Sequence, residues 1–370
     1  MSDAAGMVPR GVRLPRPGLP RLYRARRLLD LSAAVQRRRI APVRQRFYDR
    51  LWAEAAREIG ATVEPTPLRL TCIRRGPMVT YLRESEVMLD NALMFDVVGD
   101  KAFCYRLFAD RGLPVPAYCA FSPGRLADAE TFLELLGAPV AVKPMAGTGG
   151  GRGVTTGIRT AAALRRAARY ASGYGPRLLA EEELGGESIR LLYLDGVFLD
   201  AVRRERPRVT GDGRSTLRAL IRQENVRRRD AAEPVALSPL RLDEDMRNTL
   251  ARQGLGLRHV PAAGTEVTVK GAVNENAAAQ NHSIRDAIHP DIVDRIGRLV
   301  RDMGVRFAGV DLLAGDVSRP LAETDAVVHE VNANPGLHHH VLISDPAARA
   351  PVAQRVLAHL FETGSGVVDP

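Results

Sequence analysis

The chain has 370 residues, of which 45% are hydrophobic and 26% charged, and this composition excludes a disordered polymer, a collagen-like repeat and a small disulfide-stapled domain. Its formal net charge of +10 comes from residues 1–50, so the rest of the chain is electrically balanced and nucleic-acid binding by the main fold is not expected. Three cysteines without CxxC spacing indicate neither a disulfide framework nor a zinc site. No uncharged apolar stretch is long enough to span a membrane, and we expect a cytoplasmic protein without a membrane partner.

The chain begins with a basic segment. Residues 1–42 are rich in Arg and Pro and poor in apolar residues, which predicts a loosely ordered arm with a short helix near 28–39. A solvated tail is the favoured interpretation of this arm, and an arm that binds an acidic partner is the alternative. Residues 43–97 are expected to form a small N-terminal region that starts with a helix over 44–59.

The remaining sequence predicts helices that alternate with strands. Apolar spacing and stop signals predict helices over 101–110, 126–136, 160–171, 215–229, 243–253, 291–303 and 346–361. Short apolar runs predict strands at 68–74, 78–82, 140–143, 177–182, 191–194, 197–202, 306–313 and 327–332. The dipeptide Asp195-Gly196 between two of these strands is a hairpin signal. This alternation indicates an α/β or α+β fold typical of an enzyme.

Lysine is scarce in this chain. Of the 53 basic residues, 50 are Arg, and the three lysines are Lys101, Lys143 and Lys270. A surviving Lys marks a candidate position for a compact ammonium charge, such as a phosphate contact, although chance survival on the surface is the alternative.

A glycine-rich loop follows the predicted buried strand at 140–143. The loop begins directly after Lys143, and its glycines include Gly149, Gly150 and Gly151. Successive glycines let backbone N–H groups turn toward an anion, so this loop is a candidate phosphate cover. It matches neither a P-loop nor a dinucleotide-binding turn, and a flexible linker is the bland alternative.

Two further groups of polar residues lie at predicted strands. At one strand end, free backbone groups of a strand-to-loop hinge are candidates to bind an adenine edge and an acid a few residues on to bind ribose hydroxyls, with a solvated acidic strand end as the alternative for these residues. These are Glu181, Glu182, Glu183 and Glu187, with Leu184 among them. Nearer the C-terminus, Asp311 lies in one strand, and Glu330 and Asn332 share a face of the next because they are two residues apart. Their oxygens suit Mg²⁺, whereas the run 338–340 of three His is the weaker metal candidate.

Taken in order, these motifs resemble the ATP-grasp superfamily, and the similarity is greatest to the ATP-grasp domain of the cyanophycin synthetase family. The supporting stretches include KPMAGTGGGRGV from Lys143, VTGDGRSTLRALIRQEN from Val209, AGVDLL from Ala308 and EVNANPG from Glu330, and the resemblance covers roughly residues 95–361. It implies an α+β ATP-grasp fold over residues 98–363, in which two α+β subdomains enclose ATP.

The resemblance also implies roles for individual residues. Lys101, Lys143 and the glycines would bind the phosphates of ATP, Glu181 and the backbone at 182–184 the adenine, and Glu187 the ribose. Asp311, Glu330 and Asn332 would hold Mg²⁺, with Mn²⁺ as a substitute. The implied catalytic residues are Arg190, Arg204 and Lys270, which would contact the transferred phosphoryl group or the substrate.

The implied activity is that of an ADP-forming carboxylate–amine ligase. Such an enzyme activates a carboxylate of an amino acid or peptide as an acylphosphate, and an amine then attacks it to give an amide, ADP and phosphate. A glutathione-synthetase-like or D-alanine-ligase-like enzyme and a non-catalytic ATP-binding regulator are the alternatives. A Mur-ligase-like domain is not expected, and residues 274–282 depart from the family pattern, so the substrates stay open. A homodimer is expected by analogy.

Overall fold

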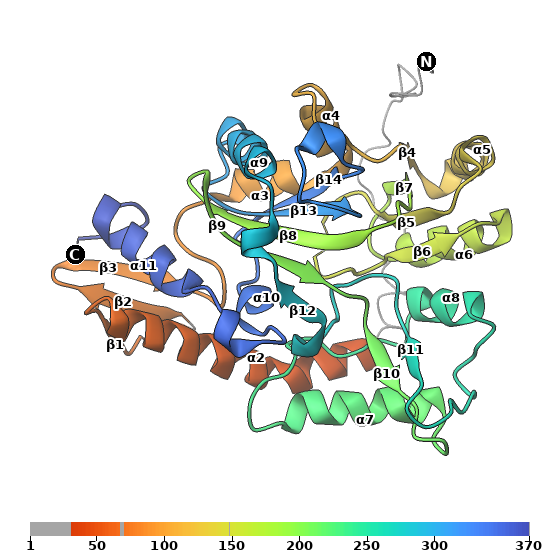
Figure 1. Cartoon of the computed structure of the whole chain (residues 1–370), viewed down its shortest axis with the longest axis horizontal. Helices are drawn as coiled ribbons and strands as arrows, with labels where there is room; N and C mark the ends of the chain where they lie inside the picture. Colours follow the sequence, from red (N-terminus) through yellow and green to blue (C-terminus); the bar gives the residue numbers. More distant parts are fainter. Residues whose placement is uncertain (1–30, 67–69, 148, 370) are drawn as a thin grey trace.

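The computed structural model describes residues 31–66, 70–147 and 149–369 (Figure 1). Helices and antiparallel sheets are interspersed along the chain, which confirms the expected α+β class. Within these described ranges, no helix combines the length and apolarity that a bilayer crossing requires.

The largest sheet has five antiparallel strands in the order β12-β9-β8-β13-β14. Its strands are β8 (Glu187–Leu194), β9 (Val197–Arg204), β12 (Asn281–Ser283), β13 (Phe307–Ala314) and β14 (Val327–Ala333). The predicted strands at 191–194, 197–202, 306–313 and 327–332 all fall within it. Since strands distant in the chain are neighbours here, the sheet brings the middle and the C-terminal part of the chain together.

The hairpin between β8 and β9 turns at Asp195 and Gly196, as their sequence predicts. Both residues have positive φ, at 47° and 74°, which is the backbone a two-residue hairpin of this type requires. The hairpin fixes the register of β8 against β9, and with it the faces on which their side chains lie.

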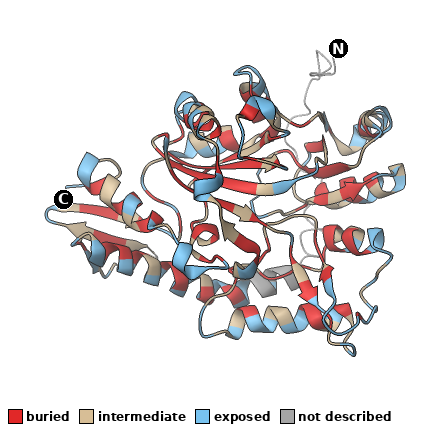
Figure 2. Cartoon of the chain, viewed as in Figure 1, coloured by how far each residue is buried: buried red, intermediate tan, exposed pale blue. Residues whose placement is uncertain are grey.

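One face of this sheet is apolar and packs against three helices. These are α3 (Ala92–Gly99), α4 (Lys101–Ala109) and α9 (Pro290–Met303), which lie above the sheet in Figure 1. Alternate strand residues such as Leu191 and Val310 are fully buried there, and Figure 2 shows the same strands as mostly buried. Because successive residues of a strand point to opposite faces, the polar residues between them lie on the other face.

A second sheet has four antiparallel strands in the order β4-β7-β5-β6 and a core of its own with α5 (Leu126–Leu136) and α6 (Ala161–Ala171). Its strands are β4 (Tyr118–Phe121), β5 (Val140–Pro144), β6 (Thr155–Ile158) and β7 (Leu178–Glu182). Strand β5 is buried along its whole length and ends at Lys143 and Pro144, where the glycine loop begins.

A third cluster joins the two ends of the described chain. Helix α2 (Leu31–Glu58) and helix α11 (Val352–Thr363) pack together with a small sheet, whose strands are β1 (Thr62–Glu64), β2 (Thr71–Arg75) and β3 (Met78–Leu82). The short helix expected near 28–39 is present in the described residues from Leu31, but it does not end in a loose arm, because residues 31–42 continue into the rest of α2. Ile40 and Val43 are buried in this core, so the helix continues through Pro42. Residues 1–30 lie outside the described residues.

The last cluster lies beside the glycine loop. Helices α7 (Leu217–Asp230) and α8 (Glu244–Arg252) surround a separate apolar core with a two-stranded sheet of β10 (Arg208–Thr210) and β11 (Glu266–Thr268). Asp243 caps α8 by accepting a hydrogen bond from the N–H of Met246. A short helix α10 (His338–Val341) follows β14, and single 3₁₀ turns lie at Pro123–Arg125, Ala278–Gln280, Arg285–Ala287, Leu321–Glu323 and Pro346–Ala348.

We predict that replacing Trp52 will destabilise the N-terminal cluster. Trp52 is fully buried in α2, and its indole N–H donates to the carbonyl of Glu84. Trp52→Ala should lower the free energy of unfolding by about 3–5 kcal/mol, measured by urea denaturation. Glu54→Ala, at a half-exposed position of the same helix, is the control and should change it by less than about 0.5 kcal/mol. Equal stability of both variants would contradict the packing of α2.

Candidate functional site

The register of the five-stranded sheet places charged side chains on one face. Asp311 of β13 lies opposite Arg190 of β8 and opposite Glu330 of β14. Arg204 of β9 is on the same face, two residues beyond Val202, which pairs with Arg190. The sheet therefore brings together four residues that the sequence analysis assigned to catalysis and metal binding.

Asp311 is held between two arginines. Its carboxylate accepts two hydrogen bonds of 2.7 Å from Arg190 Nε and Nη2, and Arg204 Nη2 lies 3.0 Å away. Burial by itself would raise the pKa of Asp311, but the two guanidinium charges outweigh it and hold this pKa well below its usual value. Burial lowers the pKa of Arg204 to about 10, although the charge of Asp311 acts in the opposite direction. For Arg190 burial also lowers the pKa, but Asp311 outweighs burial and raises it above its usual value.

Arg204 retains hydrogen-bonding capacity. Its side chain is 2% exposed, and its Nη2 also donates to Ser188 Oγ at 2.7 Å. Its Nε and Nη1 are buried without a hydrogen-bond partner among the residues described. Because buried donors without an acceptor cost free energy, these two nitrogens are suited to donate to an anionic ligand.

Lys101 joins this face from helix α4. Its ammonium lies 3.1 Å from Glu330 Oε1, and its backbone N–H donates to the carbonyl of Met145 just after β5. Asp100 caps the helix, so Lys101 begins it as the sequence predicts. Burial would lower the pKa of Lys101, but Glu330 raises it above its usual value, so the lysine stays charged.

Lys143 and Glu181 form a second buried pair on the neighbouring sheet. Lys143 Nζ lies 2.6 Å from Glu181 Oε2, and both side chains are less than 5% exposed. Tyr105 donates a 2.7 Å hydrogen bond to the same carboxylate, and His329 lies 2.9 Å from its other oxygen. Burial lowers the pKa of Lys143, whereas Lys143 and His329 outweigh burial and lower that of Glu181.

Sequence analysis missed His329 and Tyr105. Along a regular strand His329 would face away from Glu330, but the β13–β14 pairing shifts register between Asp311 and Leu312. This bulge leaves His329 unpaired in the ladder and lets it reach Glu181 while Glu330 reaches Lys101. Helical spacing after Lys101 was the only available signal for Tyr105, four residues on.

The expected metal ligands have the chemistry that Mg²⁺ requires. Asp311 and Glu330 are carboxylates paired on the adjacent strands β13 and β14. Asn332, two residues after Glu330, is the next residue on the same face of β14. In the described part of the chain, no group of three or more His, Cys, Asp or Glu side chains is arranged to hold a metal. The expected set differs from such a group because it takes its third oxygen from an amide, and it stays a prediction.

The expected adenine-binding stretch is bonded differently from what the sequence suggested. The backbone N–H groups of Glu182 and Glu183 donate to the carbonyls of Ala117 and Pro139, so these two are not free for a ligand. The Glu183 carboxylate accepts from the N–H of Gly157. Leu184 is half-buried, and Glu187 is exposed beside Arg203.

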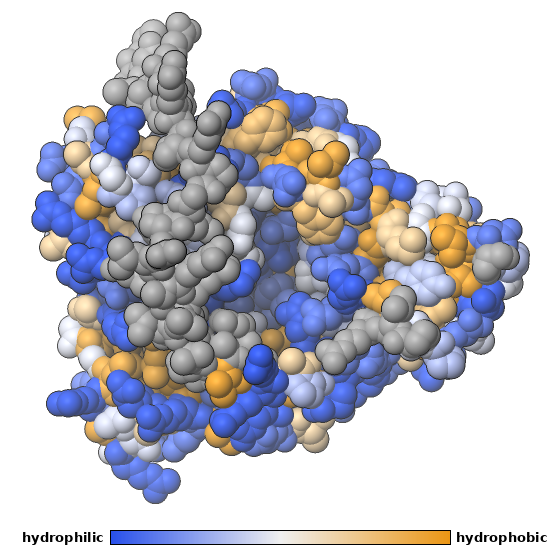
Figure 3. Space-filling view, turned by 180° about the vertical axis from the view of Figure 1, so that it is seen from behind, coloured by the Kyte–Doolittle hydropathy of each residue, from blue (hydrophilic) through white to orange (hydrophobic). Residues whose placement is uncertain are grey.

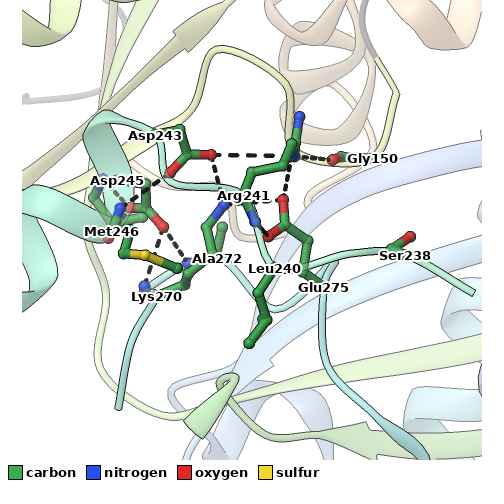
Figure 4. Close-up of polar contacts among 12 residues, drawn as sticks. Gly150, Ser238, Leu240, Arg241, Asp243, Asp245, Met246, Lys270, Ala272 and Glu275 are labelled. Atoms are coloured by element: carbon green, nitrogen blue, oxygen red, sulfur yellow. Dashed lines mark hydrogen bonds and ion pairs between the residues drawn. The ribbon is translucent and has the colours of Figure 1, made fainter. Parts of the chain in front are cut away.

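Lys270 lies apart from Lys101 and Lys143 in its contacts. Its ammonium binds Asp243 Oδ2 at 2.6 Å and Glu275 Oε1 at 3.0 Å, and its side chain is 1% exposed (Figure 4). Both carboxylates enclose the ammonium, and the expected contact of Lys270 with phosphate or substrate stays a prediction. Of the three histidines at 338–340, His338 is hydrogen-bonded to Tyr48 and His340 to Asp200, whereas His339 Nδ1 is buried without a hydrogen-bond partner among the described residues.

The surface of the molecule is hollowed in the view from behind. Figure 3 shows a recess near the middle of this face, with hydrophilic residues around much of it and apolar residues above it.

We predict that Asp311→Asn will destabilise the protein by about 3–5 kcal/mol at pH 7, because it leaves two buried guanidinium groups without their counter-charge. The pKa of Asp311 is lowered by folding, so its stabilising effect is complete above the ordinary pKa of about 4 and is lost as the pH falls toward the lowered value. Urea denaturation from pH 7 to pH 3 should show the difference shrinking in acid. Asp230→Asn, at an exposed pair with Arg229, is the control. A constant difference across this range would contradict the ion pairing.

Comparison with known proteins gives relatives of one kind. A cyanophycin synthetase from Trichormus variabilis is 33% identical over 294 residues, which cover 78% of this chain and 32% of the synthetase. The glutathione biosynthesis bifunctional protein GshAB from Streptococcus mutans is 25% identical over 280 residues, or 74% of this chain and 36% of that protein. The chain thus spans about a third of the length of these curated relatives. No protein-family model matches it.

Among solved structures, a bifunctional glutathione synthetase from Pasteurella multocida is similar with a TM-score of 0.49 and 21% identity, over 82% of this chain and 42% of that one. The sequence match to cyanophycin synthetase covers more than three quarters of the chain, at 33% identity. The chain is therefore an ATP-grasp homologue of cyanophycin synthetase over the matched residues.

Proposed function

We propose that this protein is an ATP-dependent carboxylate–amine ligase that releases ADP and phosphate. The observation that carries this proposal is the set of acid–base pairs on two neighbouring sheets and helix α4: Asp311 with Arg190 and Arg204, Glu330 with Lys101, and Glu181 with Lys143. Basic groups suited to phosphate thus lie beside carboxylates suited to a divalent cation, which is the combination that phosphoryl transfer from ATP requires.

In this proposal ATP lies between the two sheets. Lys101 and Lys143 bind its phosphates, and the glycine loop after Lys143 covers them. Gly150 and Gly151 have positive φ, at 64° and 67°, so backbone N–H groups there can turn in directions that other residues rarely reach. The residues at 181–184 stay the predicted adenine contact, without the N–H groups of Glu182 and Glu183, which are bonded within the protein.

Asp311, Glu330 and Asn332 would hold Mg²⁺, which when bound neutralises phosphate charge. Arg204, through its two unpartnered N–H groups, orients the carboxylate that receives the phosphoryl group, and Arg190 supports it from the next strand. The chain needs no side-chain nucleophile for this reaction, since its contribution is to position two substrates and to stabilise negative charge.

The substrate class proposed is an amino acid or a peptide. The names of two relatives, cyanophycin synthetase and a glutathione biosynthesis protein, support a synthetic reaction. Purified protein should be incubated with ATP, Mg²⁺ and pools of amino acids and dipeptides while ADP, AMP and phosphate are followed. Release of ADP and phosphate with one pool, together with the mass of a new amide, is the expected result. Release of AMP instead would overturn the ADP-forming assignment.

We predict that Glu330→Gln will reduce turnover by at least about a hundredfold and leave the fold intact, because it removes one carboxylate from the proposed metal site. Multiple-turnover kinetics with the substrate pool identified above, together with circular dichroism, will check this. Glu323→Gln, at an exposed position of the turn Leu321–Glu323, is the matched control and should keep full activity. Full activity of Glu330→Gln would remove Glu330 from the metal site.

A further inference from the structure

A buried cluster of four charged residues lies against the glycine loop. We call Arg241, Asp243, Lys270 and Glu275 the Arg241 cluster (Figure 4). Lys270 bridges the two acids, and Arg241 binds Glu275 through both its backbone N–H, at 2.8 Å, and its Nε. Two positive and two negative side chains balance, so the cluster is buried without a net charge, which limits the cost of removing it from water.

Arg241 also makes one contact outside the cluster. Its Nη2 donates a 2.8 Å hydrogen bond to the carbonyl of Gly150, at the centre of the glycine loop. The guanidinium thus uses one edge for Glu275 and another N–H for the loop backbone. A planar fork with several donors can do this, whereas a single ammonium point charge is poorly suited to both partners.

The glycine loop is approached closely from the same side by Asn274. A Cβ atom placed on Gly151 would lie 3.0 Å from the side-chain amide nitrogen of Asn274, so the Asn274 side chain packs closely against this glycine. Asn274 directly precedes Glu275, which places this contact next to the Arg241 cluster. The short stretch Asn274-Glu275 therefore contacts the glycine loop directly through Asn274 and indirectly through Arg241.

That piece of chain continues to the charged face of the large sheet. Residues 271–281 run from Lys270 to β12, whose Asn281 is paired with Arg204 of β9. At its beginning, Asp245 accepts hydrogen bonds from the N–H groups of Gly271 and Ala272 and from Thr156 of β6. The segment 271–281 thus connects the glycine loop at one end with the neighbour of Arg204 at the other.

We propose that Arg241 is a positioning residue that fixes the glycine loop against the segment 271–281, so that nucleotide binding at the loop is coupled to substrate binding near Arg204. This inference rests on the proposed function for its consequence, but the fixing of the loop is a property of the nucleotide-free protein. Lys270 serves the same arrangement by keeping Asp243 and Glu275 neutralised.

The test uses Arg241→Lys in the full chain. Lysine retains the positive charge that Glu275 needs but loses the fork that reaches Gly150. Hydrogen exchange of a peptide covering 147–153 should become faster in the nucleotide-free variant, while exchange in β8 and β13 stays at the wild-type rate. The dissociation constant for ADP, measured by calorimetry, should rise about tenfold, the usual effect of losing one charge-assisted hydrogen bond. KM for ATP should rise with it, and kcat should change little.

Arg227→Lys is the matched control. Arg227 lies on the exposed side of α7, where its guanidinium pairs with Glu224, so its exchange and ADP affinity should equal those of the wild type. If Arg241→Lys fails to fold, Glu275→Gln offers a second variant, because glutamine keeps the size and an acceptor oxygen but weakens the hold on Arg241; it should show the same selective change at 147–153.

Two results would overturn the proposal: wild-type exchange at 147–153 in the folded variant, or equally faster exchange throughout the protein, which would mean a general loss of stability. Failure of the proposed function is recognised separately. If the wild-type protein binds neither ADP nor ATP, the ligase assignment fails, although faster exchange at 147–153 in Arg241→Lys would still show that Arg241 fixes the loop.

Discussion

The position of Asp311 between Arg190 and Arg204 is the constraint on which the charged face of the large sheet depends. A carboxylate buried alone would be protonated or would destabilise the fold, so both guanidinium groups must be present on the two neighbouring strands. This requirement fixes β8 and β9 against β13, with the opposite face of each strand committed to the apolar core. Glu330 and Lys101 then extend the charged face to β14 and α4.

Much of this arrangement could be predicted from the sequence. Most of the longer helices and strands, the hairpin at Asp195 and the shared face of Glu330 and Asn332 follow from local patterns, because each depends on residues close together in the chain. Helix α3 and the short strands β4 and β6 were not predicted. Partner choice across the chain could not be predicted, since period-two alternation says which side chains share a face but not that Glu181 meets Lys143 or that Asp311 meets two arginines. The bulge at Asp311 and Leu312 also breaks that alternation. It lets His329 reach Glu181, whereas in a regular strand His329 would point to the other face.

The positions of the three lysines have a structural explanation that differs in part from the expected phosphate contacts. All three lysines are at least nine-tenths buried and paired with carboxylates. Lys101 and Lys143 stay predicted phosphate contacts, whereas Lys270 lies between Asp243 and Glu275 in the Arg241 cluster. A compact ammonium fits between two closely spaced acids, whereas a guanidinium is larger and directional. Arginine is used instead where one side chain must bind two partners in different directions, as Arg241 does.

For the proposed function, the paired charges imply that the metal ion and the nucleotide bind together. Glu330 and Asp311 are neutralised by Lys101, Arg190 and Arg204, so a cation that binds alone would have to displace these basic groups from their carboxylate partners. An anion arriving alone would in turn have to separate those basic groups from their carboxylates and leave buried acids unpaired, which is equally costly. When both arrive, Lys101 and the arginines can turn to phosphate and carboxylate oxygens while Asp311 and Glu330 turn to the cation. In the proposed ligase these ion pairs would take the place of the ligands until both bind, and in the nucleotide-free protein they neutralise the charged face.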